Sequence, residues 1–399
     1  MKFEAVVGQQ LLKQKLIPMI VNERLPHAIL LAGHEGVGTL PIALAIAQMV
    51  CCERVRPIKA DDGGLFGASQ PTTPQEAATD SCGECLSCQK AQKLIHPDIH
   101  FTYPVYTQKN GAKALSKDFI HDWRTVIDAN PYLNLNDWLQ YIDAENKQGN
   151  ISSAECKEII QSVSLKSFES EYKVYIIWKA EQLRDTGNIL LKVIEEPPPN
   201  TLFIFVVEQI EQVIGTILSR TQIFKLPPIL PDEMADFLVQ NENIEPDHAL
   251  KIAKISDGNI NLALQLSQLA TNQYEATLQR WFSTAVRLFG STASEASIAL
   301  QDLADEFQKL GRENQKAFLQ YCVWTLREIN ILSKGLNSEK LSTSELVYAR
   351  KVATLITPDA AQKLLTLFEN LMYHIERNVN PKINLYAVSF SMGRIFTKK

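Results

Sequence analysis

The 399-residue sequence lacks any apolar run close to the ~18 residues that a membrane-spanning helix needs, which excludes an integral membrane protein. It also lacks an excess of basic residues: 40 Lys and Arg stand against 45 Asp and Glu, a net charge of −5. The chain as a whole therefore has no electrostatic footprint for nucleic acid, and any DNA contact must come from a local patch or from other subunits. The start of the sequence, with Glu4, lacks the apolar stretch of a secretory signal, so we expect a cytoplasmic protein.

What is present is ordinary for a globular chain, with 45% hydrophobic and 21% charged residues. Strand-type apolar runs at 28–32, 173–178 and 202–207 alternate with helical patterns, which predicts an α/β module with a parallel sheet over residues 1–228. Beyond Pro231 only helical periodicity continues. We therefore predict two all-α domains after the module, a small one at 229–268 and a larger one at 269–399.

Helices are predicted within the module at about 9–23, 41–50, 154–165 and 183–195, the last closed by three consecutive prolines. Ser152 or Ser153 is the expected N-cap of the third helix. Two segments interrupt the pattern. Residues 57–80 have almost no large apolar side chains and predict an inserted loop, and residues 106–150 predict a partly helical excursion.

The segment Gly33–Leu40 follows a predicted strand and precedes a predicted helix, as a phosphate-binding loop does. The glycine framework of such a loop is kept by Gly33, Gly36 and Gly38. Thr39 stands where a lysine would neutralise phosphate charge, and Leu40 stands where a hydroxyl would hold Mg²⁺. The loop therefore predicts no ATP hydrolysis by this chain. Passive nucleotide binding stays open, because helix N-termini bind anions without a lysine.

The acidic half of an ATPase site is missing as well. Such a site needs an Asp and a Glu after an apolar strand, to hold Mg²⁺ and to activate water. Here the strand at 173–178 ends in Trp178 and continues into Lys179. Glu181 lies two residues further on, and we assign it to a solvated helix start. Two parts of one catalytic site are absent together, which predicts that the site is not used.

Five of the seven cysteines lie between positions 51 and 88. Three thiolates at three-residue intervals, with a fourth from the end of the preceding helix, are typical of a structural zinc site. The candidate ligands are Cys82, Cys85 and Cys88, with Cys52 or Cys51 as the fourth. His96 or His100 is a weaker candidate for the fourth position, because a lone histidine is more often a hydrogen-bonded structural residue.

The tripeptide Ser219-Arg220-Thr221 precedes a strand-like run. By itself it is weak evidence, because most such arginines form a surface ion pair.

Taken in chain order, these motifs resemble the bacterial clamp-loader family. The resemblance covers residues 1–228 and is carried by Val7–Gln9, Arg24–Ala28, the glycine loop, Cys82–Cys88, His96–Asp98, Leu190–Pro198 and Leu218–Arg220. Within the family the sequence is more similar to the delta-prime branch of DNA polymerase III subunits than to the gamma/tau ATPase branch.

The resemblance implies a AAA+ P-loop module, a helical lid and a collar through which five subunits assemble into an open ring. It implies that Arg220, beside Ser219, reaches in trans into a partner's ATP site, and that Asn261 replaces the lid arginine of active members. It also implies that the zinc is structural, with Cys52 as its first ligand.

We therefore expect a non-hydrolysing clamp-loader subunit of DNA replication. Its expected partners are the gamma/tau and delta subunits and, through the assembled complex, the sliding clamp and primed DNA. Two alternatives are an active gamma/tau-like ATPase and a zinc-dependent nucleic-acid-binding module.

Overall fold

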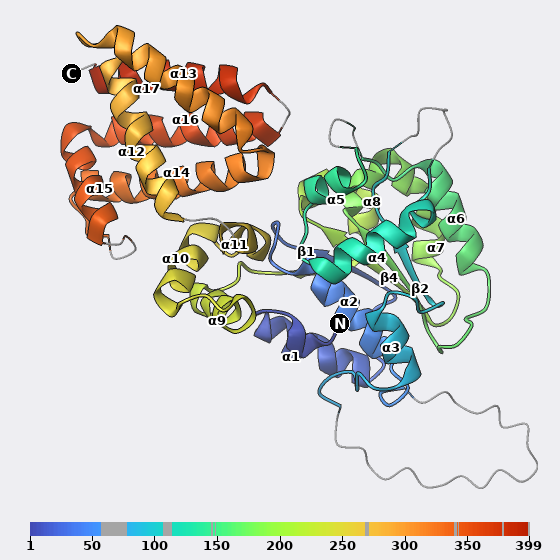
Figure 1. Cartoon of the computed structure of the whole chain (residues 1–399). Coiled ribbons are helices and arrows are strands. Elements are labelled where there is room, and N and C mark those ends of the chain that lie inside the picture. Colours follow the sequence, from blue (N-terminus) through green and yellow to red (C-terminus); the bar gives the residue numbers. More distant parts are fainter. Residues whose placement is uncertain are drawn as a thin grey trace, which may run out of the picture. The chain divides into compact units, whose positions relative to one another are not determined.

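The computed structural model describes residues 1–56, 78–106, 114–144, 147, 149–267, 271–338, 341, 343–376 and 379–397. These residues form two units (Figure 1). One consists of Met1–Glu233 with Gly258–Asn261, and the other of Met234–Asp257 with Leu262–Lys399. The predicted loop at 57–80 lies mostly outside the described residues. The predicted boundary between a lid and a collar at 268/269 stays a prediction.

The first unit is built on a five-stranded parallel sheet with the strand order β2-β3-β4-β1-β5. Its strands are β1 (Ala28–Ala32), β2 (Ile99–Thr102), β3 (Lys173–Trp178), β4 (Thr201–Val207) and β5 (Gln222–Lys225). The predicted strands and their parallel arrangement are confirmed. β2 was not predicted, because a four-residue strand with His100 and Thr102 in it carries little apolar pattern.

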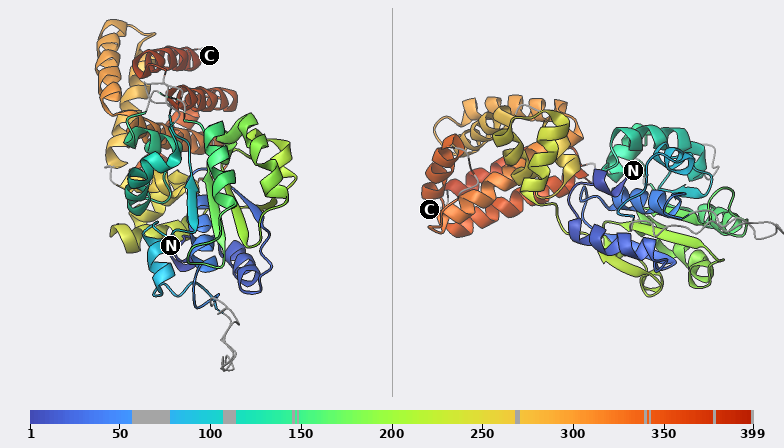
Figure 2. Two further views of the ribbon diagram at one scale, coloured as in Figure 1. Left: turned by 90° about the vertical axis from the view of Figure 1, so that its right-hand side faces the viewer. Right: turned by 90° about the horizontal axis from the view of Figure 1, so that it is seen from below.

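Helices cover both faces of this sheet (Figure 2). One face packs against α1 (Gln10–Val21), α2 (Thr39–Val50), α3 (Leu86–Gln92), α4 (Ile120–Ala129) and α5 (Leu135–Tyr141), and the other against α6 (Ser153–Val163), η3 (Ala180–Leu190) and α7 (Leu191–Glu195). Successive residues of β3 enter opposite cores: Val174 and Ile176 face α2, whereas Tyr175 and Ile177 face α6. This alternation buries both faces, as a parallel sheet requires.

The single helix predicted at 183–195 is wrong. The chain there forms 3-10 turns (η3) and then the short helix α7. Arg184 breaks the regular backbone, with φ 46° and ψ −140°. The sequence that follows, Thr186-Gly187-Asn188, consists of poor helix formers, which explains why no continuous α-helix spans the segment.

The rest of the chain is all-helical, as predicted. Its helices are α9 (Pro231–Glu242), α10 (Pro246–Ser256), α11 (Ile260–Ser267), α12 (Thr271–Arg287), α13 (Ala293–Lys309), α14 (Arg312–Ser333), α15 (Thr343–Leu355), α16 (Pro358–Glu376) and α17 (Pro381–Thr397). In the second unit Trp281, Phe318 and Phe368 form an aromatic core between α12, α14 and α16. Across the described part of the chain, no helix is both long and apolar enough to span a bilayer.

Candidate functional site

The glycine loop lies at the carboxyl end of β1 and leads into α2. The Gly33 N–H donates to the Val207 carbonyl at 3.1 Å, which ties the loop to the neighbouring strand β4. Gly36 and Gly38 have φ of 73° and 96°, a region that L side chains rarely adopt. A Cβ on Gly36 would lie 1.8 Å from the Asn259 side-chain oxygen. The backbone therefore needs glycine at position 36, and residue 259 packs directly on the loop.

The two substituted positions of the loop are buried in the first turn of α2. Thr39 is 7% exposed and Leu40 is 2% exposed. A threonine carries no positive charge, and a leucine has no oxygen for Mg²⁺. The loop thus keeps the shape of a phosphate cradle without the groups that neutralise phosphate.

A buried ion pair stands where the acidic pair of an ATPase would stand. Lys179 follows β3 with φ 55°, and its side chain is 5% exposed. Its ammonium pairs with the carboxylate of Glu208 after β4. Burial alone would lower the pKa of Lys179, but Glu208, Glu181 and Glu35 together raise it. Burial raises the pKa of Glu208 to about 7, against the attraction of Lys179. The positive charge at the carboxyl ends of β3 and β4 is therefore that of the chain's own Lys179.

The assignment of Glu181 to a solvated helix start is wrong. Its side chain is buried, and one of its carboxylate oxygens accepts a long hydrogen bond from the Glu208 N–H at 3.4 Å. Burial raises its pKa. Glu181 lies three residues beyond the end of β3, and that distance does not by itself distinguish a buried position from an exposed turn.

Trp178, which stands at the position of an acidic residue in an active ATPase, packs into an aromatic cluster. Its ring centroid lies 5.1 Å from that of Trp123, which in turn stacks on Tyr103 at 4.1 Å and meets Trp138 edge-on at 5.2 Å. Trp123 and Trp138 belong to α4 and α5, which are the helical part of the predicted excursion at 106–150. The helices α4 and α5 of the excursion and the tryptophan at position 178 thus share one aromatic core.

Residues 258–261 lie on the glycine loop with neutral side chains. The Ile260 N–H donates to the Gly36 carbonyl at 3.1 Å, and the Asn259 amide donates to Glu35 at 3.4 Å. Asn261 donates to Asp137 and accepts from Asn130, each at 2.7 Å. Asn261 therefore brings no positive charge to the loop, in contrast to the arginine that the resemblance implies at this position in active members.

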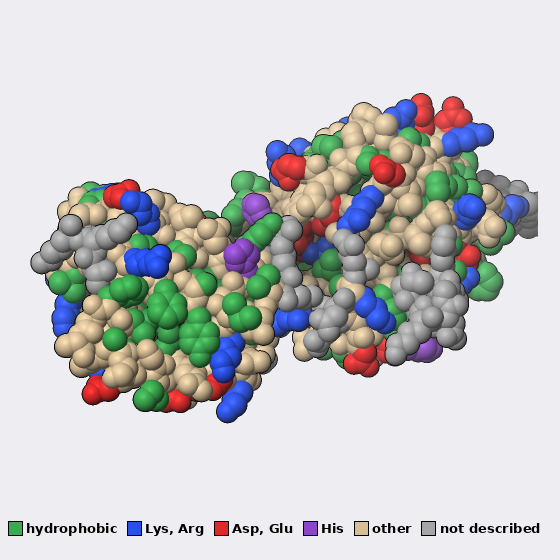
Figure 3. Space-filling model, turned by 90° about the horizontal axis from the view of Figure 1, so that it is seen from above, with side chains coloured by type: hydrophobic (Ala, Val, Ile, Leu, Met, Phe, Trp, Pro, Cys, Tyr) green, Lys and Arg blue, Asp and Glu red, His purple; other side chains and the backbone are tan. Residues whose placement is uncertain are grey.

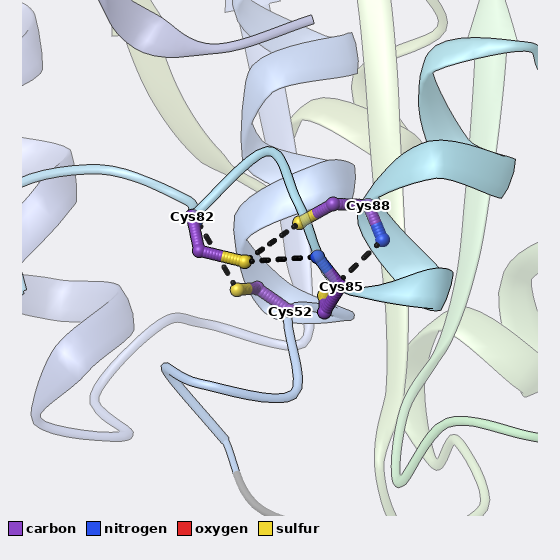
Figure 4. A group of neighbouring side chains, drawn as sticks. All are labelled: Cys52, Cys82, Cys85 and Cys88. Carbon is purple, nitrogen blue, oxygen red and sulfur yellow. Dashed lines mark hydrogen bonds between the residues drawn. The ribbon is translucent and has the colours of Figure 1, made fainter.

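Four cysteine side chains from two segments converge (Figure 4). The sulfur atoms of Cys52, Cys82, Cys85 and Cys88 all lie within 4.8 Å of one another. The Sγ atoms of Cys82 and Cys88 are 3.8 Å apart, which is the edge of about 3.8 Å expected for a tetrahedron with Zn–S bonds of ~2.3 Å.

Backbone N–H groups also point at these sulfurs, since those of Cys82, Cys85 and Cys88 donate to Cys52, Cys82 and Cys85 at 3.3–3.4 Å. Such donors stabilise negative thiolates. The cluster can therefore hold a tetrahedral metal ion.

The other candidate ligands lie outside this cluster. Cys51 is fully buried, and burial raises the pKa of its thiol to about 12. The two nitrogens of His96 face the Ser87 hydroxyl at 2.9 Å and the Asp98 N–H at 3.1 Å. His100 stacks on Tyr175. All three side chains are thus held by burial, hydrogen bonds or stacking within the protein.

Arg220 lies on the surface just before β5. Its Nε donates to Glu195 at 3.0 Å, and its Nη1 donates to the Thr216 carbonyl at 3.1 Å and to the Ser219 hydroxyl at 3.3 Å. The side chain is 32% exposed and that of Glu195 is 59% exposed. An exposed ion pair of this kind is worth ~0–1 kcal/mol and is easily exchanged for another partner.

The strand order 5-1-4-3-2, with a glycine loop after β1 and helices on both faces, defines a AAA+ P-loop module. A family model described as DNA polymerase III, delta subunit, matches residues 68–230.

Curated relatives come from two branches of one family. The delta-prime subunit of DNA polymerase III from Bacillus subtilis is 26% identical over 62% of this chain and 56% of its own length. The gamma subunit from Buchnera aphidicola is 25% identical over 68% of this chain and 59% of its own length. The chain thus spans somewhat more than half the length of these relatives.

A DNA polymerase III gamma subunit-related protein of known structure from Thermotoga maritima aligns with a TM-score of 0.39 and 13% identity, over 96% of this chain and 99% of that one. The family model and the curated relatives show that the chain is similar to subunits of DNA polymerase III.

Sequence reasoning missed four side chains around the loop, namely Tyr132, Asn134, Asp137 and Glu208. The first three lie in the excursion, for which no motif was available. Glu208 directly follows a buried strand of a parallel sheet, and that position was a usable signal.

Proposed function

We propose that this chain is a delta-prime-like, non-hydrolysing subunit of a DNA polymerase III clamp loader, and that it supplies Arg220 to the ATP site of a neighbouring subunit. The observation that carries the proposal is a contrast within one module. The chain's own loop has no lysine, no Mg²⁺ ligand and no lid arginine, whereas an arginine in a family motif stands on the surface.

A guanidinium acting in trans needs a defined position and no local nucleotide. The position of Arg220 is supported by three hydrogen bonds, to Glu195, Thr216 and Ser219. Its half-buried state leaves part of the guanidinium open to a partner. Stabilising a transferred phosphoryl group in this way is worth ~10³–10⁵ in rate in other phosphoryl-transfer systems.

We also propose that the four-cysteine cluster holds a structural Zn²⁺. Four thiolates close the coordination shell and leave no position for water, which favours a structural role. In that role the ion would tie the end of α2 to α3, because Cys52 follows α2 and Cys88 lies within α3.

The proposed partners are the gamma/tau and delta subunits, with the sliding clamp and primed DNA bound through the assembly. Support for a binding face comes from the second unit. Figure 3 shows a patch of apolar side chains on this unit, with charged side chains around it. The large exposed apolar residues of the second unit include Val286, Phe289, Ile383 and Phe390. Contiguous exposed apolar patches mark interaction surfaces.

The experiment is to mix the purified chain with the gamma-like and delta-like subunits of the same genome and to weigh the product by native mass spectrometry. We expect one copy of this chain in a five-subunit assembly. A chain that stays alone, or that replaces the gamma-like subunits, would contradict the proposal.

Similarity to gamma subunits supports a second candidate, an active gamma/tau-like ATPase. It predicts Mg²⁺-dependent ATP turnover by the chain alone, lost on Gly38→Val. The delta-prime-like proposal predicts turnover at the background rate for both proteins. A zinc-dependent nucleic-acid-binding module would instead show salt-sensitive DNA affinity that chelation abolishes.

A further inference from the structure

The segment Asn130–Asp137, which joins α4 to the first turn of α5, lies against the glycine loop. Tyr132 of this segment is 6% exposed. The Val7 N–H donates to the Tyr132 hydroxyl at 3.0 Å. A Cβ placed on Gly38 would lie 3.3 Å from Cε1 of the same ring. One aromatic ring thus spans the distance from the N-terminal segment to the loop that begins α2.

The neighbours of Tyr132 hold it in place through side-chain amides. Asn134 donates to Glu35 of the glycine loop at 3.0 Å, and it also caps α5 by accepting the Asp137 N–H at 2.8 Å. Asn130 and Asp137 both bond to Asn261, at 2.7 Å each. The segment therefore contacts the N-terminal segment, the glycine loop and residue 261 at once.

In a working P-loop module the glycine loop and the start of the helix that follows it hold the phosphates of the nucleotide, so the segment packs where a nucleotide would approach. A tyrosine ring is a flat aromatic group with a polar edge, as an adenine is, and here its oxygen accepts the Val7 N–H. The chemistry of the surroundings opposes a polyphosphate as well. Carboxylates of Glu35 and Asp137 face this region, and the Lys179 ammonium is already paired with Glu208.

We infer that the chain's own segment Asn130–Asp137 occupies the nucleotide cleft, with Tyr132 in the place of the base, so that the chain binds no adenine nucleotide while the segment is docked. The inference rests on the proposed function for the location of the cleft. It goes beyond that function because loss of hydrolysis alone would leave the loop able to bind ATP or ADP passively.

The test is equilibrium binding of a fluorescent N-methylanthraniloyl-ADP to the full chain, with and without Mg²⁺. Tyr132→Ala removes the ring, Tyr132→Phe keeps the ring and removes the hydroxyl, and Tyr141→Ala changes an exposed tyrosine of α5 as a matched control. We expect no saturation up to ~1 mM for the unchanged chain, for Tyr132→Phe and for Tyr141→Ala. Tyr132→Ala should bind at least about tenfold more tightly. Micromolar binding by the unchanged chain, or no gain in a folded Tyr132→Ala protein, would overturn the inference.

Hydrogen exchange on the unchanged chain keeps the inference testable if Tyr132→Ala does not fold. With ATP in large excess, we expect unaltered exchange at residues 34–40 and at 130–137. Slower exchange at 34–40 without faster exchange at 130–137 would mean that nucleotide and segment bind together, which contradicts the inference. Neither readout involves Arg220, so a failure here is distinct from a failure of the proposed trans role.

Discussion

Lys179→Met removes the ammonium from the buried ion pair at the edge of the sheet and keeps a side chain of similar length. Lys179 is 5% exposed and Glu208 is 18% exposed, so little solvent is available to replace the lost partner. Removing one member of a buried pair costs about 3–5 kcal/mol, because the remaining charge is left uncompensated. We expect Lys179→Met to lower the free energy of unfolding of the module by an amount in this range.

The double variant Lys179→Met/Glu208→Leu tests whether the loss comes from the unpaired carboxylate. Replacing both members of a buried pair with apolar groups is often close to neutral. We therefore expect the double variant to lose about 0–2 kcal/mol, less than Lys179→Met alone. This double-mutant cycle separates two cases. In one, Lys179 stabilises the fold through its ion pair with Glu208, and in the other it does so through its own packing.

The pH dependence of Lys179→Met has a definite sign. Burial raises the pKa of Glu208 to about 7, and loss of the ammonium raises it further. The folded state then holds a proton that the unfolded chain releases above its ordinary value of 4.5. Stability of the variant should therefore rise as the pH falls from 8 towards 5, because the protonated carboxyl carries no charge.

The assay is urea-dependent hydrogen exchange at peptides from β3 and β4, which reports the module apart from the helical unit. A loss below about 1 kcal/mol for Lys179→Met, or a double variant as unstable as the sum of its single changes, would refute the buried-pair reasoning.

The remaining predictions concern the metal, the loop and the surface arginine. We expect about one zinc per chain by mass spectrometry, lost in Cys88→Ser together with protection of α3; a fully protected metal-free chain would contradict this. Gly36→Ala should destabilise the module by about 1–3 kcal/mol in urea unfolding, whereas Gly215→Ala, with open space around it, should cost nothing; equal effects would contradict the loop geometry. Glu195→Gln should free Arg220 from its ion pair and raise the clamp-stimulated ATPase activity of the complex by at most about fivefold. A fall of more than about fivefold would assign Glu195 a direct role.

Much of the module follows from its sequence because buried parallel strands are continuous apolar runs. β1 and β3 have the predicted bounds, and β4 begins one residue earlier than predicted. The register of the sheet places Leu30 between Phe205 and Ile223, and this pairing is not encoded locally.

The site was predictable in part. The substitutions at Thr39, Trp178 and Lys179 were visible in the sequence, but their consequences were not. Trp178 joins an aromatic core with α4 and α5, and Lys179 pairs with a glutamate 29 positions away in the chain. Cys51 and Cys52 are adjacent in sequence, and only the end of α2 directs Cys52 towards the other three cysteines.

ATP hydrolysis by the reconstituted complex tests the central claim most directly. The comparison is between Arg220→Ala and Arg54→Ala, because Arg54, like Arg220, forms an ion pair with a glutamate of the same module. With assembly verified for each variant, we predict that Arg220→Ala lowers clamp- and DNA-stimulated single-turnover hydrolysis by ~10³-fold at the site that it completes, and that Arg54→Ala leaves hydrolysis unchanged. Unaltered hydrolysis in an intact Arg220→Ala complex would contradict the proposed trans role.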